Sequence, residues 1–169
     1  MLSLVERTVR HTLVVSFLAM GSGCASSPKS SVEYDGISYT QPSELVARCA
    51  EFLPSRGFGP DTGERLDHAR ACMVRAEEFG VGVEFAHAFE RYIDMLRAFV
   101  DADAAHARGE MPAMCKHLAR AIEHGKKSHE LLAAADAPDP RVKVELLSEV
   151  EAQLHAIILT HEKVGCLRQ

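Results

Sequence analysis

The chain contains no tryptophan, and aromatic side chains make up only 6% of its 169 residues. Aromatic and β-branched residues, which favour strands, do not recur in alternating runs. Alanine, leucine, glutamate and arginine are abundant instead, which favours an all-α protein over a β-sandwich. Basic side chains are in the minority, with 19 Lys and Arg against 24 Asp and Glu, so this charge balance disfavours a nucleic-acid partner.

Long apolar runs are scarce as well. The segment Thr12–Met20 contains nine mostly apolar residues, fewer than half of the roughly 20 that a transmembrane helix needs. It follows the basic residues Arg7 and Arg10, and it precedes the small residues Gly21–Gly23. This order is typical of a cleaved export signal, so we do not expect a transmembrane anchor.

Cys24 comes directly after these small residues. The segment resembles the lipobox of bacterial lipoproteins, in which the chain is cut before a cysteine that then carries acyl chains such as palmitate. This resemblance implies a signal peptide over 1–23, acylation of Cys24 and a periplasm-facing protein whose lipid holds it to the membrane of the cell envelope. Gly21 stands where a lipobox usually carries leucine, which leaves secretion with a free Cys24 as an alternative. Ala25, in place of aspartate, favours the outer membrane over the inner one.

The mature chain is predicted to contain a tether and one domain. Residues 24–41 form the lipidated cysteine and a flexible tether, because five serines and a proline follow Cys24 without a sustained hydrophobic period. Packing of Tyr34, Ile37 and Tyr39 on the domain, or a short extended patch at these residues, is the alternative. Residues 42–169 form the domain, since this length is sufficient for one hydrophobic core.

Hydrophobic periodicity predicts one short helix and four long ones. The short helix begins at Pro42, with Ser43 as its N-cap, and ends before Pro54. The long helices are expected at 62–80, 83–108, 111–135 and from 141 onward, the last with an apolar stripe that starts at Leu147. Their short connections predict an antiparallel all-α bundle. An α-solenoid is the alternative, because residues 107–125 resemble part of a tetratricopeptide repeat, although the pattern does not recur.

Four cysteines remain in the predicted domain, and an exported protein keeps such residues mostly as disulfides. In an antiparallel hairpin, residues that face each other have their sequence midpoint near the turn. The midpoint of Cys49 and Cys72 is 60.5, beside a Gly-Pro-Asp turn, and that of Cys115 and Cys166 is 140.5, beside Pro140. These two pairs are therefore favoured among the three possible connectivities. Buried thiols are the alternative, and a redox pair is disfavoured because the chain has no C-x-x-C motif.

Two histidines, His129 and His161, fall on apolar helix seams and are the candidate ligand residues. With Cys115 opposite Cys166, the antiparallel register places His129 near position 152 and His161 near position 120, so the two side chains should not meet. Hydrogen-bonded core histidines are therefore favoured over metal ligands.

No catalytic motif or glycine-rich phosphate loop occurs in the chain, so we expect neither catalytic residues nor a cofactor or metal. We expect a non-catalytic module that is structural or binds a protein of the cell envelope. The alternative is a bundle that binds a metal or a small ligand, and a hydrolase ranks third.

Overall fold

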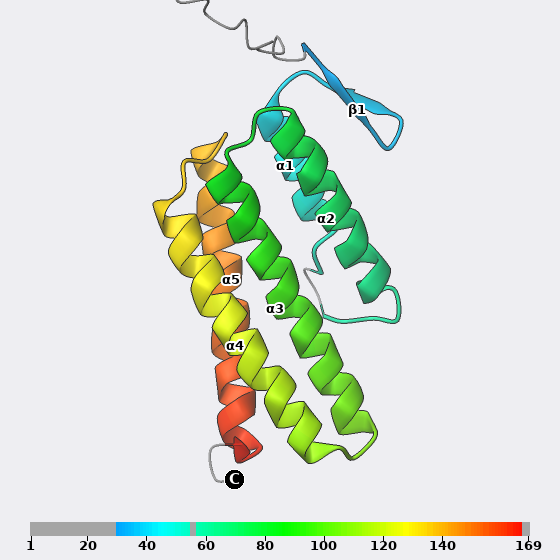
Figure 1. Ribbon diagram of the computed structural model, residues 1–169, viewed down its shortest axis with the longest axis vertical. Coiled ribbons are helices and arrows are strands. Elements are labelled where there is room, and N and C mark those ends of the chain that lie inside the picture. Colours follow the sequence, from blue (N-terminus) through cyan, green and yellow to red (C-terminus); the bar gives the residue numbers. More distant parts are fainter. Residues whose placement is uncertain (1–29, 55–56, 167–169) are drawn as a thin grey trace, which may run out of the picture.

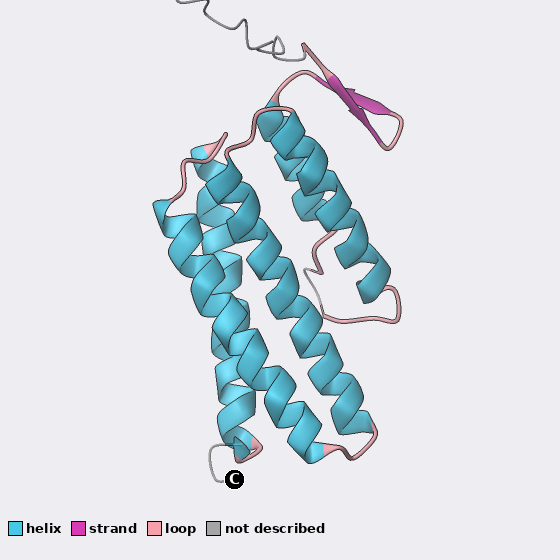
Figure 2. Ribbon diagram, viewed as in Figure 1, coloured by secondary structure: helices cyan, strands magenta, loops and turns pink. Residues whose placement is uncertain are grey.

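A computed structural model describes residues 30–54 and 57–166 of the chain. In these ranges a two-stranded antiparallel sheet precedes five helices (Figures 1 and 2). The elements are β1 (Val32–Tyr34), β2 (Ile37–Tyr39), α1 (Pro42–Glu51), α2 (Thr62–Glu78), α3 (Val83–Ala107), α4 (Met111–Ala134) and α5 (Pro140–Lys163). The predicted all-α bundle of four long helices and one short helix is confirmed. None of the helices in the described ranges has the length and apolar character needed to cross a membrane.

Helices that are consecutive in the chain pack against each other: α1 on α2, α2 on α3, α3 on α4 and α4 on α5. Helices α3, α4 and α5 run along the whole length of the molecule, whereas α1 and α2 lie beside the part of α3 nearest its start (Figure 1). Helices α1 and α5, the first and the last in the chain, are also in contact, but only over a short stretch. The α1–α5 seam is therefore much less extensive than the seams between consecutive helices.

Prolines and glycines set the ends of the helices. Pro42 and Pro140 are the first residues of α1 and α5. An amide hydrogen at this position would have no acceptor within the helix, so proline costs no hydrogen bond there. Gly109, after α3, adopts a φ of 72°, a conformation that glycine reaches without steric cost. At α1 the N-cap is Gln41, so the prediction of Ser43 was wrong, because Pro42 already occupies the first helical position.

Small residues allow α3 and α4 to approach closely. Gly125 of α4 is buried, and a Cβ atom added there would lie 2.6 Å from Met95 Sδ of α3 and 2.9 Å from Leu154 Cδ1 of α5. The hydroxyl of buried Ser128, one turn further along, donates a hydrogen bond of 2.8 Å to the carbonyl oxygen of Ala88. Gly125 therefore marks the point where three helices converge.

Replacing Gly125 by valine is expected to lower the free energy of unfolding by about 2 kcal/mol, because the added methyl groups must displace Met95 and Leu154 in a filled core. The matched control is Gly63→Val in the first turn of α2, where an added Cβ meets nothing within 4 Å. Urea unfolding of both variants checks this prediction. Equal stabilities would contradict the close packing at Gly125.

The hairpin was not expected. Residues 32–39 were assigned to the flexible tether, but β1 pairs with β2 in the register Val32 to Tyr39, and both of these side chains are buried in the core. Asp35 and Gly36 form the turn with φ values of 54° and 71°, as a two-residue hairpin loop requires. The folded domain therefore begins ten residues before Pro42, the predicted start.

Candidate functional site

The predicted acylation residue, Cys24, lies outside the described residues, but the hairpin shortens the chain between it and the domain. Seven residues, 25–31, separate Cys24 from β1, in place of the 17 residues assigned to the tether. At about 3.3 Å per residue, the maximum reach of this linker falls from roughly 60 Å to roughly 25 Å. A lipid on Cys24 would thus hold the domain close to the bilayer.

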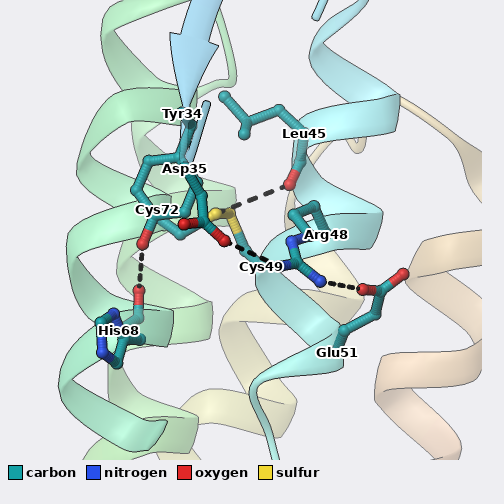
Figure 3. The surroundings of a disulfide bond; sticks show 8 residues. All are labelled: Tyr34, Asp35, Leu45, Arg48, Cys49, Glu51, His68 and Cys72. Atoms are coloured by element: carbon teal, nitrogen blue, oxygen red, sulfur yellow. Dashed lines mark hydrogen bonds and ion pairs between the residues drawn. A yellow bond between two sulfur atoms is a disulfide. The ribbon is translucent and has the colours of Figure 1, made fainter. Parts of the chain in front are cut away.

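The first disulfide joins α1 to α2 inside the core. Cys49 and Cys72 are bonded with a Cα–Cα distance of 5.3 Å, and both residues are fully buried (Figure 3). Cys72 Sγ lies 3.8 Å from the carbonyl oxygen of Leu45. Neither sulfur carries a hydrogen atom, so this approach is a packing contact. The bond fixes the short helix α1 on its neighbour.

Polar contacts attach the hairpin to both helices around this disulfide (Figure 3). Arg48 of α1 forms ion pairs with Asp35 of the hairpin at 2.9 Å and with Glu51 at 2.6 Å. The hydroxyl of Tyr34 donates a hydrogen bond of 3.1 Å to the carbonyl oxygen of His68 in α2. Partial burial, together with the negative charge of Asp35, raises the pKa of Tyr34, which keeps this hydroxyl a donor. The start of the domain is therefore held on two sides.

The second disulfide closes the opposite end of the molecule. Cys115 in the first turns of α4 is bonded to Cys166, which follows α5, with a Cα–Cα distance of 5.4 Å. Both residues are half-buried, in contrast to the first pair. The structure thus contains the two cysteine pairs that the midpoint argument favoured. One joins α1 to α2, the helices that follow the hairpin, and the other joins the start of α4 to the residues after α5.

The two candidate histidines do not meet. His129 Nε2 lies 2.8 Å from Glu151 Oε1 of α5, one residue from the position that the disulfide register predicted. His161 is half-buried and lines a cavity of about 330 Å³ between α4 and α5, together with Ala119 and Lys126. In residues 30–54 and 57–166 no three His, Cys, Asp or Glu side chains are grouped so that they could hold a metal ion. The prediction of core histidines was wrong, because the His129 side chain is 39% exposed and His161 is only half-buried.

A groove lies along the α1–α5 seam. It has a volume of about 330 Å³. The apolar side chains that line it are Ala47, Ala50, Leu53, Pro54, Val142 and Leu146. Leu53, Pro54 and Leu146 are buried, whereas Ala47 is exposed, so the groove reaches from the core to the surface. We refer to it below as the α1–α5 groove.

Among the described residues, all of the charged side chains that line the α1–α5 groove are carboxylates: Glu51, Glu145 and Glu149. Glu51 pairs with Arg48, and Glu149 accepts a hydrogen bond of 3.1 Å from the amide of Gln153. Among the described residues Glu145 forms no ion pair. The groove therefore combines an apolar lining with excess negative charge.

Tyr92 of α3 lies in the core near this groove. Its side chain is fully buried, and its hydroxyl finds no hydrogen-bond partner among the described residues. Burial raises the pKa of Tyr92 far above its ordinary value, and the negative charge of Glu149 in the groove raises it further. The hydroxyl of Tyr92 therefore stays protonated, and it makes no hydrogen bond with the described residues.

The smaller cavity between α2 and α3 is different in character. It has a volume of about 110 Å³, and its lining includes Arg70, Glu77, His87 and Glu90. Arg70 is already paired with Asp94, and it lies 3.9 Å from Glu90. This cavity thus already contains a cation of the chain, Arg70, and it is smaller than the α1–α5 groove, which leaves the groove as the more distinctive site.

The α1–α5 groove was not predicted from the sequence. The apolar stripe assigned to the last helix began at Leu147 and pointed only to the face that packs on α4. Val142 and Leu146 form a second apolar pair four residues apart, and Glu145 and Glu149 flank it with the same spacing. This spacing was the available signal, but only the fold shows that α1 lies opposite.

The comparisons with known proteins give no relative: no family model, curated protein or solved structure matches this chain.

Proposed function

We propose that this chain is a bacterial lipoprotein, held to the cell envelope by acyl chains on Cys24, whose helical domain binds a protein partner without catalysing a reaction. The observation that carries the proposal is the order of features at the N-terminus. A short apolar export segment and three small residues precede Cys24, and a folded domain begins only eight residues later. This arrangement suits a domain that works close to a membrane surface.

The disulfides support export. Structural disulfides persist in oxidising compartments, such as the bacterial periplasm, and are rare in the cytosol. Cys49 and Cys72 are fully buried and bonded, and Cys115 and Cys166 form a second bond. A chain that folds around two such bonds is suited to the periplasmic side of the envelope.

The chemistry of the α1–α5 groove supports binding in preference to turnover. In the part of the chain that the structure describes, its lining contains carboxylates and apolar side chains, but no serine, cysteine or histidine that could act as a nucleophile or as its base. Apolar grooves between helices commonly receive a segment of another protein. A lipid tether also raises the local concentration of the domain near partners in the same membrane.

Replacing Cys24 by serine is expected to release the protein from the membrane. In a Gram-negative host the wild-type chain should sediment with membranes, with more in the outer than in the inner fraction, and should require detergent for extraction. The variant, exported with an ordinary cleavable signal in place of residues 1–23, should appear in the periplasmic extract, because stable anchoring requires two or more acyl chains. Immunoblots of the fractions check this, and circular dichroism of both proteins controls for folding. A wild-type chain in the periplasmic extract, or a variant that stays in the membrane, would defeat the anchor.

The binding function needs a separate experiment. A photoreactive residue is placed in living cells at one exposed position on each of three helices: Glu44, Val74 or Leu159. We expect at least one position to give a discrete protein adduct, which is lost when Cys24 is replaced by serine. If no position gives an adduct while the chain is anchored, the proposed binding of a protein partner is wrong, whereas the proposed acylation of Cys24 is unaffected.

A further inference from the structure

Building on the proposed binding function, we infer that the α1–α5 groove receives an amphipathic segment of the partner protein that carries lysine or arginine beside its apolar face. The two disulfides indicate why this seam is the open one. They fasten α1 to α2 and α4 to the end of α5, and neither crosses from α1 to α5. Helices α1 and α5 meet only over a short stretch, so their apolar side chains are not fully covered.

The size of the groove fits a few side chains of a bound segment. Its volume of about 330 Å³ is at the lower end of the range for pockets that hold small ligands. The lining comes from two helices, with Ala47 and Ala50 on one side and Val142 and Leu146 on the other. A helix can insert apolar residues spaced three or four apart into such a groove, as in other helix-in-groove complexes.

Charge complementarity identifies the flanks of this segment. Glu145 and Glu149 project from successive turns of α5, and Glu51 lies across the groove on α1. Of these three carboxylates, only Glu51 forms an ion pair with Arg48. A segment with lysine or arginine next to its apolar residues would neutralise the remaining charge, whereas an acidic segment or a phosphate-bearing surface would be repelled.

The test uses the whole mature chain with Cys24→Ser, which keeps it in solution, and a synthetic helical peptide of leucine and lysine with leucine on one face. Fluorescence anisotropy of the labelled peptide should show saturable binding. Glu145→Lys combined with Glu149→Lys should raise the Kd by about tenfold or more, since two attractive charges become repulsive. Ala47→Trp should also weaken binding, because it fills the groove and leaves every charge in place.

The control variant, Glu123→Lys combined with Glu162→Lys, makes the same change in net charge. Both residues are exposed. Glu123 lies on α4, and Glu162 lies on α5 at the cavity that His161 lines. Its Kd should stay within about twofold of the parent, because surface charges away from the site act weakly. A leucine and glutamate peptide should not bind, and thermal melts verify that each variant is folded.

Three results would overturn the inference. The first is an absence of binding by the leucine and lysine peptide. The second is an equal loss of affinity in the groove variant and the control variant. The third is binding of dodecylammonium in place of the peptide, which would make the groove a small-molecule site. A discrete adduct at Val74 or Leu159 in the cross-linking experiment would then preserve the proposed function. Failure of the groove and failure of the binding module are thus distinguishable.

Discussion

Replacing both Cys49 and Cys72 by alanine is expected to lower the free energy of unfolding by about 3 kcal/mol or more. The bond closes a loop with a sequence separation of 23 residues, and its loss returns roughly 3 to 4 kcal/mol of loop entropy to the unfolded chain on the usual polymer model. Both sulfur atoms are fully buried, so their removal also leaves a void between α1 and α2. These two effects act in the same direction.

The expected loss is a large share of the stability of an ordinary domain, which is about 5 to 15 kcal/mol. The variant should therefore melt roughly 10 °C below the wild type, and the hairpin, which is attached through Arg48 and Tyr34, should lose its protection against hydrogen exchange. Calorimetry and hydrogen exchange measure these changes. Glu64→Ala, an exposed change in the first turn of α2, serves as the surface control. An unchanged melting temperature would show that α1 is held by packing alone.

Replacing Cys115 and Cys166 by alanine is expected to act mainly on one end of the molecule. The closed loop is longer, with a separation of 51 residues, which corresponds to about 4 kcal/mol on the same model. The cysteines are half-buried, however, and no residue from Ile158 to Cys166 is fully buried. These residues can therefore fray without global unfolding.

Hydrogen exchange should resolve this local effect. Amides near the end of α5 should exchange about a hundredfold faster or more in the variant, whereas amides of α3 should change less. Unfolding by urea should also show a lower midpoint. Uniform loss of protection across the bundle would mean that the second disulfide stabilises the whole domain, contrary to the expectation of local fraying.

Much of this fold can be predicted from local patterns. The predicted start of α3 at Val83 and of α4 near Pro112 agrees with the structure, because glycine and proline limit the possible helix ends. The disulfide midpoints depend only on the geometry of antiparallel neighbours. The same register placed His129 near position 152, and the structure brings it to Glu151.

The hairpin shows where reading of hydrophobic periods fails. Each strand contains three residues, which is too short for an alternating pattern to stand out from a serine-rich segment. The turn residues Asp35 and Gly36 were the stronger signal, because this pair favours a two-residue hairpin loop. Burial of Val32 and Tyr39 depends on contact with the helices, and such contact is absent from the local sequence.

The α1–α5 groove could not be predicted for a different reason. It exists because α1 ends at Glu51 and the chain then turns away at buried Leu53 and Pro54, opposite the first turns of α5. The two sides are almost 100 residues apart in sequence, and their relative position depends on the packing of α2, α3 and α4 between them. Only the assembled fold places the carboxylates of α5 beside the apolar end of α1.

The most direct test of the proposed anchored and doubly bonded domain is the intact mass of the protein extracted from its native membrane, measured before and after reduction. We predict a chain that starts at Cys24 and carries two or three acyl groups, with a gain of about 4 Da on reduction, because each of the four bonded sulfurs takes up one hydrogen atom. A chain without acyl groups would contradict the anchor. An unchanged mass on reduction would contradict the disulfide framework on which the domain is built.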